Sequence, residues 1–98
     1  MLVKIHKSYR DVVGICDKEL IGKKFEEGKF QLDIKDSFFN GKELNSEEAE
    51  EMLRDMSAED ATFNIIGQKS TQLALKVGII GQEGIGTIDN IPFALVLM

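Results

Sequence analysis

Residues 61–78 read ATFNIIGQKSTQLALKVG, an apolar segment followed by a glycine and a second, more polar segment. The first part, residues 61–66, is apolar and β-branched, which is typical of a strand. Residues 68–77 have the pattern of a helix, and Gly78 favours the left-handed conformation in which many helices end. The stretch therefore predicts a strand that turns at Gly67 directly into a helix.

The segment before this stretch predicts another helix with its own start signal. Asn45 or Ser46 can accept a hydrogen bond from a free backbone N–H group, and Glu48 lies three residues after Asn45, as in a capping box. Apolar residues then recur on one helical face, at Ala49, Met52, Leu53 and Met56. The opposite face carries mostly carboxylates, which we interpret as a solvated surface.

The first third of the chain predicts two short strands, residues 3–7 and 12–16, joined by a three-residue loop. Pairing Ile5 with Ile15 across this loop places four residues together on the opposite face of the sheet, namely Lys4, His6, Gly14 and Cys16. Residues 17–22 then predict one helical turn, which Asp17 caps and Gly22 ends.

Two further segments complete the predicted fold. Alternation in residues 29–35 predicts a strand with Phe30, Leu32 and Ile34 on one side. The six apolar residues 93–98 are best buried on both faces, in the middle of a sheet or under a partner. We therefore expect an α+β fold, a single domain over residues 1–98 with a mixed sheet of about five strands, two main helices and one short helical turn.

Composition limits the setting of the protein. The single cysteine, Cys16, has no internal partner for a disulfide, so we expect a reducing compartment and a cytoplasmic location. No apolar run approaches the roughly 20 residues that span a bilayer, so we expect no membrane contact. The net charge of −5 is uneven, because residues 1–30 carry a net +2 and residues 31–60 a net −7.

The charge distribution points to the first third as the candidate binding region. Because affinity for RNA comes mainly from cations that meet phosphates, we predict that any RNA contact is made by Lys4, Lys7, Lys23 and Lys24. The pair Phe38-Phe39 offers a second candidate, stacking on nucleobases. The alternative for this pair is that it anchors the following turn to the core.

Catalytic and cofactor motifs are weaker. Gly67 and Lys69 stand where a strand meets a helix, but their spacing is not that of a phosphate-binding loop, which leaves only an anion site at the helix N-terminus. Cys16 and His6 share a predicted sheet face and are the residues on which a small cysteine-dependent enzyme would be built, although a lone cysteine is usually a buried apolar residue. We assign no catalytic residue, cofactor or metal ligand.

Three strings occur in a recognisable order and spacing: CDKELIGKKF at 16–25, NIIG at 64–67 and IPFA at 91–94. Together they resemble the archaeal domain of unknown function 424, over nearly the whole chain. The resemblance implies a small cytoplasmic archaeal protein with no established enzymatic activity, and some family members are described as RNA-binding. Histidine is common in the family after the proline, where this chain has Phe93.

These observations favour a non-catalytic binding or adaptor module, with RNA or a ribonucleoprotein of archaeal information processing as its partner. One alternative is a protein–protein interaction subunit that uses the acidic face or the apolar C-terminal strand, through which a homodimer would form. The other is an enzyme that uses Cys16.

Overall fold

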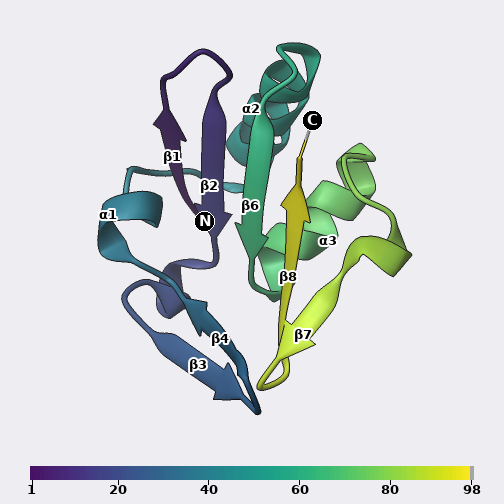
Figure 1. The fold of residues 1–98 in the computed structure, drawn as a ribbon. Coiled ribbons are helices and arrows are strands. Elements are labelled where there is room, and N and C mark those ends of the chain that lie inside the picture. The colour runs from purple at the N-terminus through teal and green to yellow at the C-terminus, as the bar shows by residue number, and fades with distance from the viewer. Residues whose placement is uncertain (98) are drawn as a thin grey trace.

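A mixed six-stranded sheet forms the centre of the protein, as a computed structural model that describes residues 1–97 shows (Figure 1). Its strands lie in the order β5-β1-β2-β6-β8-β7. Their bounds are β1 Leu2–His6, β2 Val12–Cys16, β5 Lys42–Glu43, β6 Thr62–Ile66, β7 Gly86–Ile88 and β8 Ile91–Val96. The central pair, β2 and β6, is parallel, and every other pair is antiparallel.

Helices α2 (Ser46–Ala58) and α3 (Gln68–Val77) cover one face of this sheet and lie behind it in Figure 1. The core between the layers is apolar, and its fully enclosed members include Val13, Ile15, Leu53, Phe63 and Ile65. Burying each such large side chain contributes about 1.5–3 kcal/mol. The central strands are therefore closed by packing on this face.

The other face is covered only over its lower half. There the short helix α1 (Asp36–Phe39), the 3₁₀ turn η1 (Lys18–Leu20) and a separate hairpin of β3 (Lys24–Glu27) and β4 (Phe30–Asp33) enclose a second apolar cluster. Cys16, Ile34, Phe39 and Ile66 belong to this cluster. A second 3₁₀ turn, η2 (Gln82–Gly84), precedes β7.

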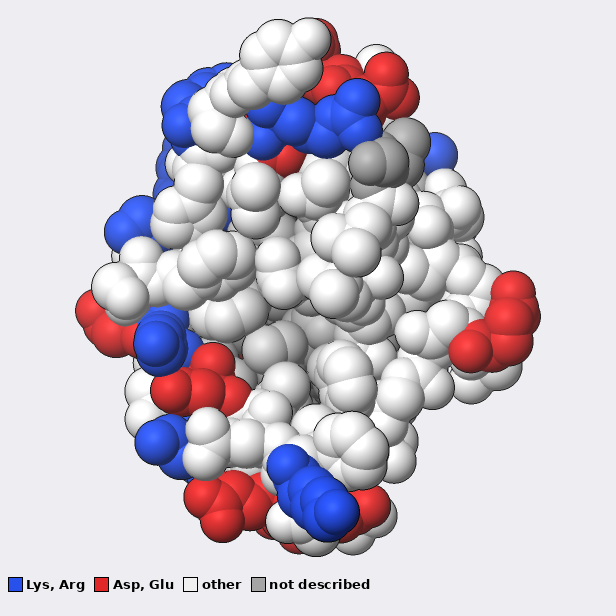
Figure 2. Space-filling model, in the orientation of Figure 1, with Lys and Arg blue, Asp and Glu red and all other residues white. Residues whose placement is uncertain are grey.

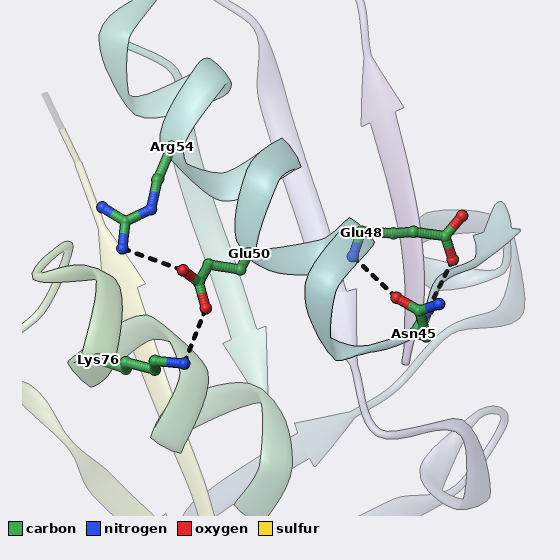
Figure 3. Close-up of polar contacts among 5 residues, drawn as sticks. All are labelled: Asn45, Glu48, Glu50, Arg54 and Lys76. Atoms are coloured by element: carbon green, nitrogen blue, oxygen red, sulfur yellow. Dashed lines mark hydrogen bonds and ion pairs between the residues drawn. The ribbon is translucent and has the colours of Figure 1, made fainter.

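The start of α2 and the end of α3 are formed as their sequences predict. The Asn45 side chain accepts from the Glu48 backbone N–H at 2.8 Å, and the Glu48 carboxylate accepts from the Asn45 backbone N–H at 3.0 Å (Figure 3). Gly78 adopts the left-handed conformation, with φ of 88°, at the end of α3. Glu50 of α2 binds Lys76 of α3 at 3.0 Å and so joins the two helices.

The predicted α+β class, mixed sheet and two main helices are confirmed. The strand count is larger than expected, because β5 and β7 are too short to show a pattern and the hairpin forms its own sheet. The predicted register of β1 and β2 is wrong by two residues, since Ile5 pairs with Val13 across a longer loop. A shift of two keeps each side chain on its face, so Lys4, His6, Gly14 and Cys16 do share one face.

Two other expectations need correction. The C-terminal strand β8 lies inside the sheet, but it is not buried on both faces: Ala94 is buried, whereas Leu95 is 55% exposed and Leu97 is 73% exposed. Helices cover only one side of this part of the sheet, so alternate residues face solvent. Met98 lies outside the described residues. Phe30, expected beside Leu32, is 71% exposed because it sits at the tip of the hairpin.

Candidate nucleic-acid interface

The four lysines predicted to bind RNA do not form one patch. Lys4 lies in β1 on the half-covered face, and its ammonium group donates to the Ser37 carbonyl at 2.8 Å. Lys7 follows the other end of β1 and pairs with Asp11 at 3.1 Å. Part of this positive charge is therefore held by neighbouring residues of the chain itself.

Lys23 and Lys24 lie away from Lys7, where the chain enters the hairpin. Lys24 stands directly opposite Asp33 in the β3–β4 pairing, which places a carboxylate next to its charge. Figure 2 shows the result, with blue and red atoms interspersed around the rim of this face. The net positive charge of residues 1–30 thus does not produce a single positively charged patch on the folded surface.

The centre of the same face is uncharged over a wide area (Figure 2). The strand register places Asn64 of β6 in its middle, between Gly14 of β2 and Leu95 of β8. Phe93 points to the same side and its ring packs over Gly86. We call this surface, the part of the sheet opposite α2 and α3 that α1 and the hairpin leave uncovered, the open face.

A hollow of about 280 Å³ lies at the border between the open face and α1. Its lining combines aromatic, aliphatic, amide and charged side chains, and consists of Leu32, Asp33, Lys35, Phe38, Phe39, Asn64 and Ile66. The amide of Asn64 makes no side-chain hydrogen bond to any residue between 1 and 97. Its donor and acceptor atoms are therefore available to a ligand.

Phe38 is held in place by its neighbours. Its ring stacks on His6 with centroids 4.5 Å apart, and the His6 Nε2 atom lies 2.9 Å from the Phe38 carbonyl oxygen. The backbone of β2 comes very close below, since a Cβ atom at Gly14 would lie 2.9 Å from the Phe38 ring. The aromatic pair therefore does anchor α1 to the sheet, while Phe38 stays partly exposed beside the hollow.

The predicted anion site at the N-terminus of α3 is filled by the chain itself. Asp17, only 3% exposed, accepts from the backbone N–H groups of Lys69 at 3.0 Å and Ser70 at 2.9 Å, and from the Ser70 hydroxyl at 2.8 Å. Asp17 thus caps α3 and not η1, where its side chain makes no capping bond. With its own carboxylate there, this helix end cannot take an external anion.

Cys16 lies where a nucleophile cannot act. It is fully buried, and burial, followed by the nearby charge of Asp17, raises the pKa of its thiol to about 11. His6 lies on the same face but pairs with Val12, whereas Cys16 pairs with Leu2 at the far end of β1. The two are four residue steps apart along the strands, about 13 Å. The structure does not bring the thiol and the imidazole together.

Sequence reasoning missed Asn64, Lys35 and Phe93 as members of this face. A signal for Asn64 is present, because Thr62 and Asn64 alternate with the buried Phe63 and Ile65 and so mark the other face of β6. Among residues 1–97, no three or more His, Cys, Asp or Glu side chains are placed to hold a metal ion. Nor is any helix in that range long and apolar enough to cross a bilayer.

Comparison with known proteins gives a family and a fold. A family model described as "Protein of unknown function (DUF424)" matches residues 6–98. No curated protein matches. The crystal structure of an uncharacterized conserved protein from Methanopyrus kandleri is similar, with a TM-score of 0.86 and 22% sequence identity over 97% of this chain and 88% of that one. At this identity the likeness concerns the fold.

Proposed function

Since this chain belongs to the DUF424 family of proteins of unknown function, we propose its function from its own surface: a non-catalytic module that binds single-stranded RNA on the open face. The observation that carries the proposal is the hollow, where a partly exposed aromatic ring, a free amide and a cation meet, at Phe38, Asn64 and Lys35. We place the module in the cytoplasm, where its free thiol stays reduced.

Each of the three groups suits one part of a nucleotide. Bases stack on aromatic side chains, at about 1–3 kcal/mol per base, and this contact needs unpaired bases. The amide of Asn64 can pair with a base edge through one donor and one acceptor. Lys35, at the rim, can meet the phosphate of the same nucleotide. The uncharged centre of the open face leaves room for neighbouring bases.

The proposal moves the site away from the predicted lysines. Of these, only Lys4 lies beside α1, and its ammonium group is already bonded to Ser37. Lys7, Lys23 and Lys24 can add long-range attraction at the rim, which salt screens. A partner in archaeal information processing stays a prediction.

Fluorescence anisotropy with labelled single-stranded RNA tests the site. We expect Phe38→Ala to weaken binding by about 5- to 150-fold, the equivalent of one lost stacked base. Phe30→Ala is the matched control, since Phe30 is 71% exposed on the hairpin and does not line the hollow. The contribution of the Lys35 charge to binding is tested with Lys35→Glu. Its control is Lys29→Glu, because Lys29 lies at the hairpin turn.

Two results would contradict the proposal. Duplex RNA that binds as tightly as single-stranded RNA would exclude base stacking. Equal losses in Phe38→Ala and Phe30→Ala would exclude the hollow. Circular dichroism of each variant shows whether the loss comes from unfolding.

The protein–protein alternative has one observation in its favour, the free part of β8. β7 pairs only with Ile91–Phe93, so the rest of β8 up to Val96 has no neighbouring strand on that side within the described residues, and Leu95 and Leu97 are exposed there. Such an edge can pair with a second copy. Light scattering tests this: a dimer that becomes a monomer in Leu95→Lys would support a homodimer through β8.

A further inference from the structure

A second concave surface lies on the other side of the sheet, between its β1 edge and α2. It is a groove of about 620 Å³. Its lining combines charged residues with five apolar side chains, those of Val3, Ile5, Leu44, Met52 and Met56. Ile5 and Val3 point away from the open face, so the groove and the proposed RNA site lie on opposite faces.

The strand edge beside this groove is free at Ile5. Met1 and Leu44 exchange two backbone hydrogen bonds, of 3.0 and 2.8 Å. Along an antiparallel ladder, hydrogen-bonded pairs alternate with pairs that are not hydrogen-bonded, so the next hydrogen-bonded pair is Val3 with Lys42. Ile5 is the next residue of β1 whose backbone N–H and C=O groups point to this side. β5 ends before that point, and Ile5 is 36% exposed. Its outward N–H and C=O groups therefore have no partner strand within residues 1–97.

β5 stops there because its chain turns away. Gly41 precedes β5 and lies so close to β1 that a Cβ atom would overlap the Val3 carbonyl oxygen. The preceding residues of the chain belong to α1, which lies on the opposite face of the sheet. The edge position beyond Val3 is thus accessible to a strand from another molecule.

The charged residues that line the groove indicate which kind of strand it can bind. α2 lines the groove with Glu48, Glu51 and Asp55. Glu48 is engaged in the capping box, whereas Glu51 and Asp55 form no ion pair with the residues that the structure describes. Two lysines also belong to the lining. Lys42 lies opposite Val3, at the end of the groove that β5 already occupies, and Lys4 donates its ammonium hydrogen to the Ser37 carbonyl.

We propose that this groove binds an extended, basic segment of a partner protein. The segment pairs with the free edge of β1 at Ile5, places apolar side chains between β1 and α2, and sets Lys or Arg against Glu51 and Asp55. Strand addition to a sheet edge supplies affinity through the main chain and specificity through side-chain pockets. A second copy is disfavoured, because a chain of net charge −5 would bring further carboxylates to this rim.

A synthetic probe tests the groove without knowledge of the natural partner. The probe is a labelled ten-residue peptide of alternating valine and lysine, and its twin carries glutamate in place of lysine. We expect binding of the lysine peptide only, with slower hydrogen exchange at the Ile5 amide in NMR spectra. Glu51→Lys should weaken binding about tenfold, the scale of one charge pair.

The matched control is Glu47→Lys, which makes the same charge change on the same helix outside the groove. Equal effects of Glu47→Lys and Glu51→Lys, equal binding of the two peptides, or an unprotected Ile5 amide would each overturn the proposal. Concentration-dependent shifts at Ile5 without peptide would overturn it in favour of a second copy. If RNA shifts the NMR signal of the Ile5 amide, the groove binds nucleic acid and the peptide proposal is overturned. If RNA fails to bind at Phe38, the proposed function fails, but the peptide experiments still decide what the groove binds.

Discussion

Asp17 is a small residue whose replacement should strongly lower the free energy of unfolding. Its carboxylate joins the end of β2 to the start of α3 through three hydrogen bonds to Lys69 and Ser70. The close approach depends on Gly67, where a Cβ atom would overlap the Asp17 carboxylate. Asp17→Ala leaves two backbone N–H donors and one hydroxyl without an acceptor, and Ser70 is fully buried.

The cost follows from these three donors. Each orphaned backbone donor costs about 1–2 kcal/mol and the lost hydroxyl bond about 1 kcal/mol, so Asp17→Ala should lose about 3–5 kcal/mol. Small domains have a net stability of about 5–15 kcal/mol. We therefore expect the urea midpoint to fall by about 2–4 M and Tm by more than about 12 °C. Asp17→Asn keeps one acceptor oxygen, and its loss should be intermediate.

Asn45→Ala provides the comparison, because Asn45 caps α2 at an exposed site. Its expected cost is about 1 kcal/mol. Urea unfolding of the three variants, followed by circular dichroism, gives the ranking. If Asp17→Ala costs no more than Asn45→Ala, the buried cap does not stabilise α3 as argued. If Asp17→Ala does not fold at all, Asp17→Asn against Asn45→Ala decides the question.

Four further predictions concern single features. Maleimide should label native Cys16 far more slowly than the urea-unfolded chain, because burial raises the thiol pKa to about 11; equal rates would contradict this. Hydrogen bonds from Lys76 and, to a smaller degree, from Arg54 lower the pKa of Glu50, so Glu50→Gln should lower Tm at pH 7, and this effect should disappear as the pH falls through the folded-state pKa of Glu50; an effect that does not change with pH would refute it. Gly14→Ala should destabilise by about 1–3 kcal/mol in urea unfolding, because its Cβ displaces Phe38; an unchanged midpoint would show that α1 yields freely. Deleting all residues after Phe93 removes the β8 partners of Phe63, Asn64 and Ile65 and should yield unfolded or insoluble protein; a soluble product with unchanged Tm would exclude this.

The elements that the sequence predicted well carry their signals locally. The capping box of Asn45 and Glu48 marks the start of α2, and Gly78 marks the end of α3. Each signal lies within a few residues of the chain. The true partner of Asp17 was not predictable in this way, since Ser70 lies 53 positions further on. The register of β1 and β2 depends on loop geometry, and alternation alone cannot distinguish shifts of two residues.

In the candidate site, too, local features could be predicted from the sequence and long-range features could not. Counting charges placed it on Lys4, Lys7, Lys23 and Lys24, but the fold sends Lys7 and Lys24 to separate places and gives each a carboxylate neighbour. The hollow is assembled from α1, β4 and β6, which no local pattern connects. Of its members, the pair Phe38-Phe39 was a stacking candidate in the sequence, and Asn64 was open to prediction from the alternation within its own strand.

The parallel pairing of β2 with β6 has a consequence for how fast the chain folds. Val12 pairs with Thr62 and Cys16 with Ile66, fifty positions apart in each case. The loop entropy of closing so long a segment must be lost before the contacts form, and such long-range pairing slows folding towards milliseconds to seconds. Substitutions in β6 should therefore slow refolding, whereas substitutions in the local β3–β4 hairpin should mainly speed unfolding.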